Sequence, residues 1–200
     1  MRSLENADLQ ERIAAVLAGD IQKFEAIMQA YQRPIFFYCY HMLGQYNEAE
    51  DCGQEVFLKA YRSLGQYDPN LPFGAWLYTI AYNQCIDVIR KRKLTKYLSL
   101  FYRDDQENRP VDQHMEANYP DAAVQQTMAM LTAEERNLLL LRTVEELSYQ
   151  EISRMLHQNT ARLRKRYERS ARKFRKYYAQ AKGVKHYGYG QGSGAEGTSS

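Results

Sequence analysis

The apolar residues of this chain recur three and four positions apart in two separate blocks, and this spacing constrains the fold most. In the first block they include Phe24, Ile27 and Tyr31, and in the second block Leu163 and Tyr167. A repeat near 3.6 residues is typical of helices that bury one face and expose the other. The pattern therefore predicts an all-α fold class, built from two small helical domains.

Composition divides the 200 residues into four parts. We expect a first domain over residues 1–96, a linker over 97–120, a second domain over 121–182 and a flexible Gly-, Ser- and Tyr-rich tail over 183–200. The linker is polar and contains prolines, so we expect it to be flexible and to hold little regular structure. Its acidic residues are Asp104, Asp105, Glu107, Asp112 and Glu116.

Helix start and stop signals set the expected elements of the first domain. Asp20 and Asn47 are good helix caps, and Pro34 suits the first turn of a helix. The expected order is a helix from Ile21, a helix that begins at Pro34, a helix over 48–64, a loop over 65–72 and a helix over 73–92.

The second domain carries stronger local signals. Thr132 with Glu135, and Ser148 with Glu151, have the spacing of a capping box, in which each side chain bonds the other's backbone N–H. A two-residue turn then leads to Asn159, which can cap a third helix. A short helix, a tight turn and a basic helix indicate a helix-turn-helix that reads the DNA major groove.

Charge is distributed unevenly along the chain. Residues 152–186 contain twelve Lys or Arg and one acidic residue, whereas the whole chain has a net charge of only +3. A basic end on an acidic body indicates a polyanion partner for that end.

The cysteines and the N-terminus exclude several protein classes. Cys39, Cys52 and Cys85 are far apart and form no CxxC pair, so we expect plain core cysteines, without a disulfide framework or a zinc knuckle. No metal or other cofactor is predicted. There is no run of about 18 apolar residues and no signal peptide, so we expect no membrane insertion and a cytoplasmic protein.

Two stretches of the chain resemble the extracytoplasmic-function (ECF) sigma factors of bacteria. The first contains EAEDCGQEVFLKAY at 48–61 and YDPNLPFGAWLYTIAYN at 67–83, and the second contains LTAEERNLLLLR and LSYQEISRML from Leu131 onward. The resemblance implies a sigma subunit that binds core RNA polymerase, recognises minus-ten and minus-thirty-five promoter elements and initiates transcription of a stress-type regulon.

The resemblance implies a polymerase-docking face on the helix over 48–64. In the family this helix docks on the clamp helices of the largest subunit, and the matching outward residues are Asp51, Gln54, Glu55 and Leu58. Their spacing places them on one helical face.

The resemblance also implies recognition of the minus-ten element as unpaired bases, which need polar groups to read their edges and aromatic rings to stack on. Phe73 and Trp76 are expected to support the core instead. The residues implied at this element are Asn70, Tyr78, Thr79, Asn83, Arg90 and Lys91.

In the minus-thirty-five duplex, arginine can donate two hydrogen bonds to guanine, and glutamate can accept a hydrogen bond from the cytosine amino group. His157 stands where the family often has Gly, and Arg162 stands where a small residue is common, so the promoter sequence stays open. The groove-facing residues implied are Arg162, Arg164, Lys165, Glu168 and Arg169.

The family context extends to the remaining segments and partners. The acidic linker is expected to thread the positively charged channels of the polymerase. We also expect an anti-sigma factor that can hold the chain at the membrane, and association with the nucleoid when the chain is active.

The sequence leaves two other classes of protein to consider, a free-standing DNA-binding regulator and an enzyme. A free-standing helix-turn-helix regulator would bind duplex DNA without polymerase, and would leave the face from Asp51 to Leu58 unexplained. An enzyme is disfavoured because no nucleophile motif, metal-ligand spacing or phosphate-binding glycine loop occurs.

Overall fold

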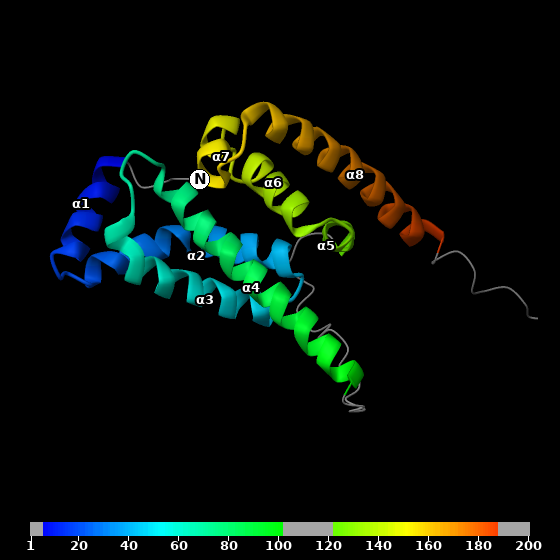
Figure 1. The fold of residues 1–200 in the computed structure, drawn as a ribbon, viewed down its shortest axis with the longest axis horizontal. Coiled ribbons are helices and arrows are strands. Elements are labelled where there is room, and N and C mark those ends of the chain that lie inside the picture. Colours follow the sequence, from blue (N-terminus) through cyan, green and yellow to red (C-terminus); the bar gives the residue numbers. More distant parts are fainter. Residues whose placement is uncertain (1–5, 102–121, 188–200) are drawn as a thin grey trace, which may run out of the picture.

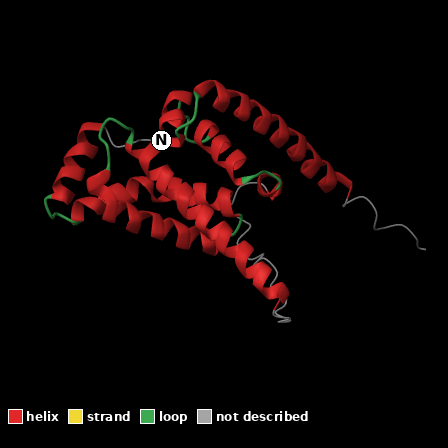
Figure 2. Cartoon of the chain, in the orientation of Figure 1, coloured by secondary structure: helices red, strands yellow, loops and turns green. Residues whose placement is uncertain are grey.

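The computed structural model describes residues 6–101 and 122–187, and these fold into helices joined by short loops (Figures 1 and 2). The expected all-α fold is confirmed for this part of the chain. None of these helices is long and apolar enough to cross a membrane. The elements are α1 (Asn6–Leu17), α2 (Gln22–Leu43), α3 (Tyr46–Ser63), the 3-10 turn η1 (Leu64–Gln66), α4 (Phe73–Phe101), α5 (Ala122–Ala129), α6 (Ala133–Thr143), α7 (Tyr149–Leu156) and α8 (Thr160–Tyr187).

In the first block, α2, α3 and α4 pack around a core that α1 closes at one end. The expectation that Pro34 begins a new helix is wrong, because Pro34 lies inside the continuous helix α2. Proline removes one helical hydrogen bond and costs about 3 kcal/mol. Ile27 and Ile35 on either side of it are fully buried, and their packing keeps the two halves of α2 in line.

Other helix ends also differ from expectation. Asn47 is not the cap of α3, which begins at Tyr46 after the extended residue Gln45. Helix α4 continues past Arg92 to Phe101, so residues 97–101 of the expected linker are helical. The rest of the linker, with all five of its acidic residues, and residues 188–200 of the tail lie outside the described residues.

The local signals of the second block are confirmed. The Thr132 and Ser148 side chains each accept from the backbone N–H three residues on, and both capping boxes are complete. The Asn159 side chain accepts from the Ala161 N–H at 2.8 Å and so caps α8. His157 ends α7 in the left-handed region at φ 51°, the conformation that favours glycine, so the turn forms here without one.

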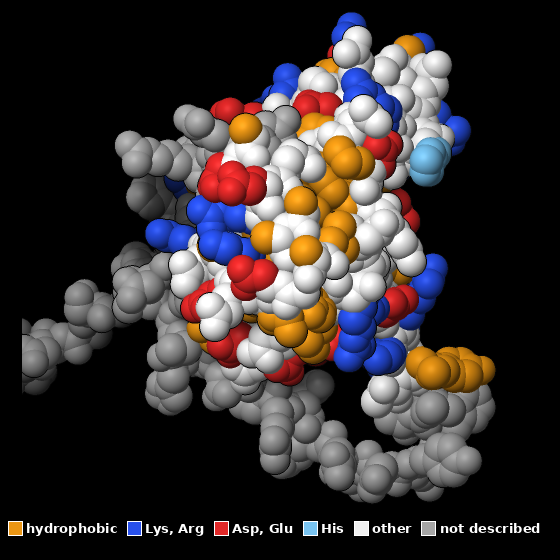
Figure 3. Space-filling view, turned by 90° about the vertical axis from the view of Figure 1, so that its left-hand side faces the viewer, with side chains coloured by type: hydrophobic (Ala, Val, Ile, Leu, Met, Phe, Trp, Pro, Cys, Tyr) orange, Lys and Arg blue, Asp and Glu red, His pale blue; other side chains and the backbone are white. Residues whose placement is uncertain are grey.

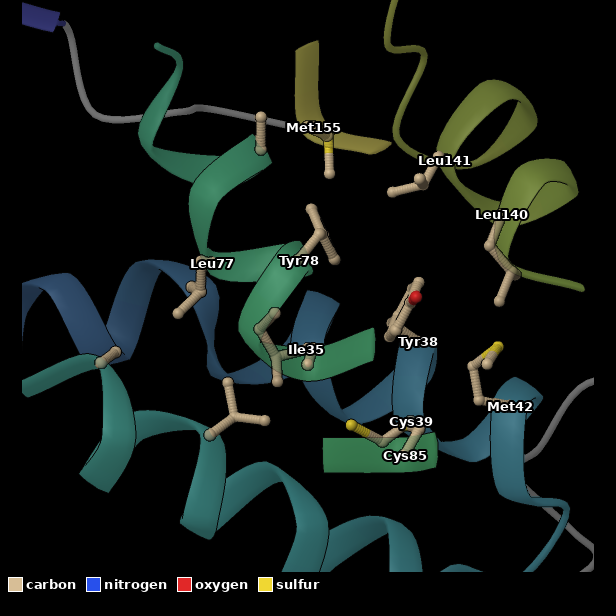
Figure 4. Packing of buried hydrophobic residues seen from close by; sticks show 14 of the residues in the cluster. Ile35, Tyr38, Cys39, Met42, Leu77, Tyr78, Cys85, Leu140, Leu141 and Met155 are labelled. Atoms are coloured by element: carbon tan, nitrogen blue, oxygen red, sulfur yellow. The ribbon is translucent and has the colours of Figure 1, made fainter. Parts of the chain in front are cut away.

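The two blocks pack against each other and share one apolar core. Figure 4 shows Tyr38 and Tyr78 of the first block beside Leu140, Leu141 and Met155 of the second. At this boundary the Tyr38 hydroxyl donates to Asn137 Oδ1 at 2.7 Å, and both side chains are buried. The sequence predicted two domains but gave no sign of this contact between them.

Candidate functional site

Helix α8 has a basic outer face, and its inner face packs against the rest of the second block. Leu163 and Ser170 face inward and are buried, and Lys173 forms an ion pair with Glu135 of α6 at 2.9 Å. The residues predicted to read the minus-thirty-five element all lie exposed on the outer faces of α8, and they are Arg162, Arg164, Lys165, Glu168 and Arg169.

Helix α7 and the turn after it each contact one arginine of α8. The Arg164 guanidinium lies 5.5 Å from the centre of the Tyr149 ring, which also contacts Tyr167 edge-on. Arg166 donates to the Gln158 side chain at 2.7 Å. Arg166 is thereby drawn toward the turn, whereas the guanidinium of Arg164, stacked on an aromatic ring, keeps its hydrogen-bond donors available for a base or a phosphate.

Helix α3 exposes the residues predicted to dock on polymerase. Asp51, Gln54 and Leu58 are exposed and Glu55 is half-buried, while the opposite face of α3 is buried in the core. Leu58 keeps 49% of its surface exposed beside these polar side chains.

Further apolar side chains are exposed on the first block. Leu17, Ile21 and Tyr61 are also exposed, and Figure 3, which views the molecule from its α1 end, shows hydrophobic side chains gathered between charged ones. An apolar surface bordered by charges is typical of a protein-binding face.

A groove of about 1180 Å³ runs between α3 and α4. Its α3 wall carries Asp51 and Glu55, and its α4 wall carries Arg90 and Lys91. The structure therefore brings two residues predicted for polymerase docking to the same groove as two predicted for phosphate contact. Lys59 crosses between the walls and donates to Gln84 Oε1 at 2.5 Å.

The other residues predicted for the minus-ten element are in three different settings. Asn70 is exposed in the loop before α4, and its backbone and side-chain N–H groups both donate to Asp68 Oδ1 at 2.9 Å. Asn83 is exposed on α4 and lines a smaller hollow of about 370 Å³. Thr79 is half-buried and donates to the Ala75 carbonyl at 3.1 Å.

Tyr78 is the exception, because only 3% of it is exposed. It packs against Tyr38 and lies under the second block (Figure 4). Burial first, and the nearby Glu145 carboxylate second, raise the pKa of the Tyr78 hydroxyl above its ordinary value. In this arrangement Tyr78 cannot reach DNA. Phe73 is buried as expected, and Trp76 packs on it from a half-buried position.

One cluster was missed by the sequence analysis. Cys39 on α2, Cys52 on α3 and Cys85 on α4 are free and buried, as expected, but their sulfur atoms lie within 4.8 Å of one another. No spacing in the sequence signals this meeting, since each cysteine comes from a different helix and only their packing brings them together.

Comparisons with known proteins agree with the geometry. The family model for sigma-70 region 2 matches residues 27–95, and that for sigma-70 region 4 matches residues 121–174. The chain is 33% identical to the ECF RNA polymerase sigma factor SigW of Bacillus subtilis, over 84% of this chain and 95% of SigW. It is 30% identical to the RNA polymerase sigma-H factor of Pseudomonas aeruginosa, over 74% of this chain and 81% of that protein.

Two solved structures share the fold. Sigma factor RpoE from Bartonella quintana, in complex with the anti-sigma factor NepR, aligns with a TM-score of 0.63 at 17% identity, over 78% of this chain and 96% of RpoE. CnrH in complex with the cytosolic domain of CnrY aligns with a TM-score of 0.60 at 20% identity, over 82% of this chain and 92% of CnrH.

Proposed function

The chain belongs to the ECF family of RNA polymerase sigma factors, and we propose which of its surfaces serve the two tasks of that family. It is a transcription initiation factor and not an enzyme; it binds core RNA polymerase and recognises promoter DNA. The alternative of a free-standing regulator is not favoured, because region 2 and region 4 occur together and in order.

Core polymerase binds to the outward face of α3. The observation that carries this assignment is the exposed row of Asp51, Gln54 and Leu58 on a helix whose opposite face is buried. Carboxylates around one apolar side chain suit a basic partner surface with an apolar centre, such as the clamp helices of the largest subunit. Glu55 joins the row from the groove side.

Promoter DNA binds to two further surfaces. The exposed basic face of α8 reads the minus-thirty-five element as a duplex, with Arg162, Arg164, Lys165, Glu168 and Arg169 toward the major groove. Asn70, Thr79 and Asn83 contact unpaired bases of the minus-ten element, and Arg90 and Lys91 contact its phosphates. Tyr78 takes part only after the second block moves away from α4.

We propose that an anti-sigma factor holds this chain when it is inactive. The support is the fold shared with RpoE and CnrH, each solved with such a partner or with a cytosolic domain. We also propose that the chain acts in the cytoplasm, at the nucleoid when polymerase is bound, and that the anti-sigma factor can hold it at the membrane.

Assembly with core polymerase tests the α3 assignment. The double variant Asp51→Arg with Gln54→Ala places a positive charge on the docking face and should weaken assembly at least about tenfold. Binding is measured by titration of labelled chain with core enzyme, followed by run-off transcription. Glu11→Arg makes the same charge change on α1 and should bind as the unmodified chain does. Equal affinity of the double variant would reject the α3 face.

A further inference from the structure

All three cysteines of the chain meet at one point in the core of the first block. Cys39, Cys52 and Cys85 are 0%, 2% and 0% exposed, and the Cys52 and Cys85 sulfurs are 3.6 Å apart. Figure 4 shows Cys39 and Cys85 side by side where α2 and α4 pass each other. Three thiols on three helices form a cluster that neither polymerase docking nor promoter recognition uses.

The spacing of the sulfurs fits a metal ion. Metal–thiolate bonds are about 2.3 Å long, so three sulfurs around one ion in their plane are about 4.0 Å apart. The Cys52 and Cys85 sulfurs are 3.6 Å apart and all three sulfurs lie within 4.8 Å of one another, so adjustments of about 1 Å bring every sulfur to bonding distance. Within the described residues no histidine or carboxylate joins the cluster as a fourth ligand.

The donor set selects the kind of ion. Thiolates are soft ligands that favour Cu(I), zinc and iron–sulfur clusters. Structural zinc takes four protein ligands, and a three-ligand zinc site needs an open position for water. Cu(I) is stable with three sulfur ligands and no water. We propose that Cys39, Cys52 and Cys85 form a three-thiolate site for Cu(I) in the core of this chain.

The groove between α3 and α4 gives the ion a route to the cysteine cluster. Cys52 lies on the floor of that groove, beside Lys59. Cu(I) displaces the three thiol protons as it binds. The groove is lined both by cations, including Arg90 and Lys91, and by carboxylates.

The ion would tie α2, α3 and α4 together. Anything that binds only the folded state raises stability by mass action, so Cu(I) should raise the melting temperature of the first block. The site is independent of promoter recognition, and its failure would leave the proposed function untouched.

The test is a competition for Cu(I) under anaerobic, reducing conditions. The full chain is titrated with Cu(I) against a coloured Cu(I) chelator, and the metal-to-protein ratio is read by native mass spectrometry. We expect one Cu(I) per chain, ultraviolet absorption from Cu–thiolate charge transfer and a rise in melting temperature of roughly 5 °C or more.

Single substitutions decide whether the three sulfurs are the ligands. Loss of partners that only orient ligands costs 10–100-fold in metal affinity, so Cys39→Ala, Cys52→Ala and Cys85→Ala should each cost about 100-fold or more. Val56→Ala removes a similar volume from the same core and keeps every thiol, so it should bind Cu(I) as the unmodified chain does. Serine variants replace any alanine variant that circular dichroism finds unfolded.

Two outcomes would overturn the proposal. In the first, the chelator would remove Cu(I) as readily from the unmodified chain as from Cys85→Ala. In the second, the chain would retain one Zn(II) but no Cu(I).

Discussion

The two blocks of this sigma factor carry their candidate recognition residues in opposite ways. On α8 the five residues proposed for the minus-thirty-five duplex are all exposed on one helix. In the first block the proposed minus-ten residues are divided between a loop and α4, and Tyr78 is covered by the second block. Under the proposed assignments, recognition of the minus-thirty-five duplex needs the second block alone, whereas recognition of the minus-ten element depends on how the two blocks are arranged.

The largest expected effect distinguishes two residues of α4 that were both predicted at the minus-ten element. Tyr78→Ala removes a buried ring from the contact between the blocks, so the free energy of unfolding should fall by about 3–5 kcal/mol. Asn83→Ala changes an exposed side chain and should stay within about 0.5 kcal/mol. Urea denaturation of both variants measures the difference. Similar losses from the two substitutions would contradict the burial of Tyr78 in solution.

The next largest effect concerns DNA binding by α8 of the second block. Arg164→Ala and Arg169→Ala should each cost about 1–3 kcal/mol of binding free energy at one position of the minus-thirty-five element, because we propose that each arginine contacts a base. Arg175 is exposed just past the middle of α8, beyond the proposed base-reading residues. Arg175→Ala should weaken binding to all sequences equally and reduce the salt slope by about one.

Binding titrations on single-base-changed duplexes at several salt concentrations distinguish these two behaviours. If all three variants alter only the salt slope, α8 is a non-specific polyanion grip and the base-reading assignment is wrong.

A smaller effect is expected at the start of α7. Ser148→Ala removes the side-chain half of a capping box and should cost about 1 kcal/mol of stability. Ser148→Asp retains an acceptor for the Glu151 N–H and should cost only a few tenths. Thermal melting monitored by circular dichroism measures both. If Ser148→Asp lost as much stability as Ser148→Ala, the Ser148 hydroxyl would do more than cap the helix.

The smallest effect is a pH dependence at the pair of Glu135 and Lys173. Burial opposes ionisation of Glu135, but hydrogen bonds from Lys173 and the Thr132 N–H outweigh it and hold its pKa below the ordinary value of 4.5. A carboxyl with a lowered folded-state pKa stabilises the fold above its unfolded pKa and loses that contribution as the pH falls.

Stability should therefore decline as the pH falls from about 5 through the lowered pKa of Glu135, and Lys173→Gln should flatten this decline. Urea midpoints measured over that range report the change. An unchanged slope in Lys173→Gln would mean that other carboxyls dominate.

The sequence predicts the second block well because its signals are local. A capping box needs only residues three apart, so Thr132, Ser148 and Asn159 were each assigned correctly from sequence alone. The turn at His157 follows from the elements on either side of it, even without glycine.

The sequence predicts the first block less well, because tertiary packing overrides the local helix signals there. Pro34 is a strong breaker, yet the buried neighbours Ile27 and Ile35 keep α2 continuous. Tyr78 was assigned to the minus-ten element through the family resemblance, but its burial depends on a second block that lies far along the chain. The meeting of Cys39, Cys52 and Cys85 likewise depends on how three helices cross.

The extension of α4 to Phe101 changes the mechanics of the connection between the blocks. Nine helical residues beyond Arg92 form a rod of about 13 Å, so the connection begins at the tip of that rod and not at the body of the first block. Twenty residues, 102–121, then remain to reach α5, and whatever path they take they span at most about 70 Å. Stiffening or shortening either part resets the range of promoter spacings that one molecule can bridge.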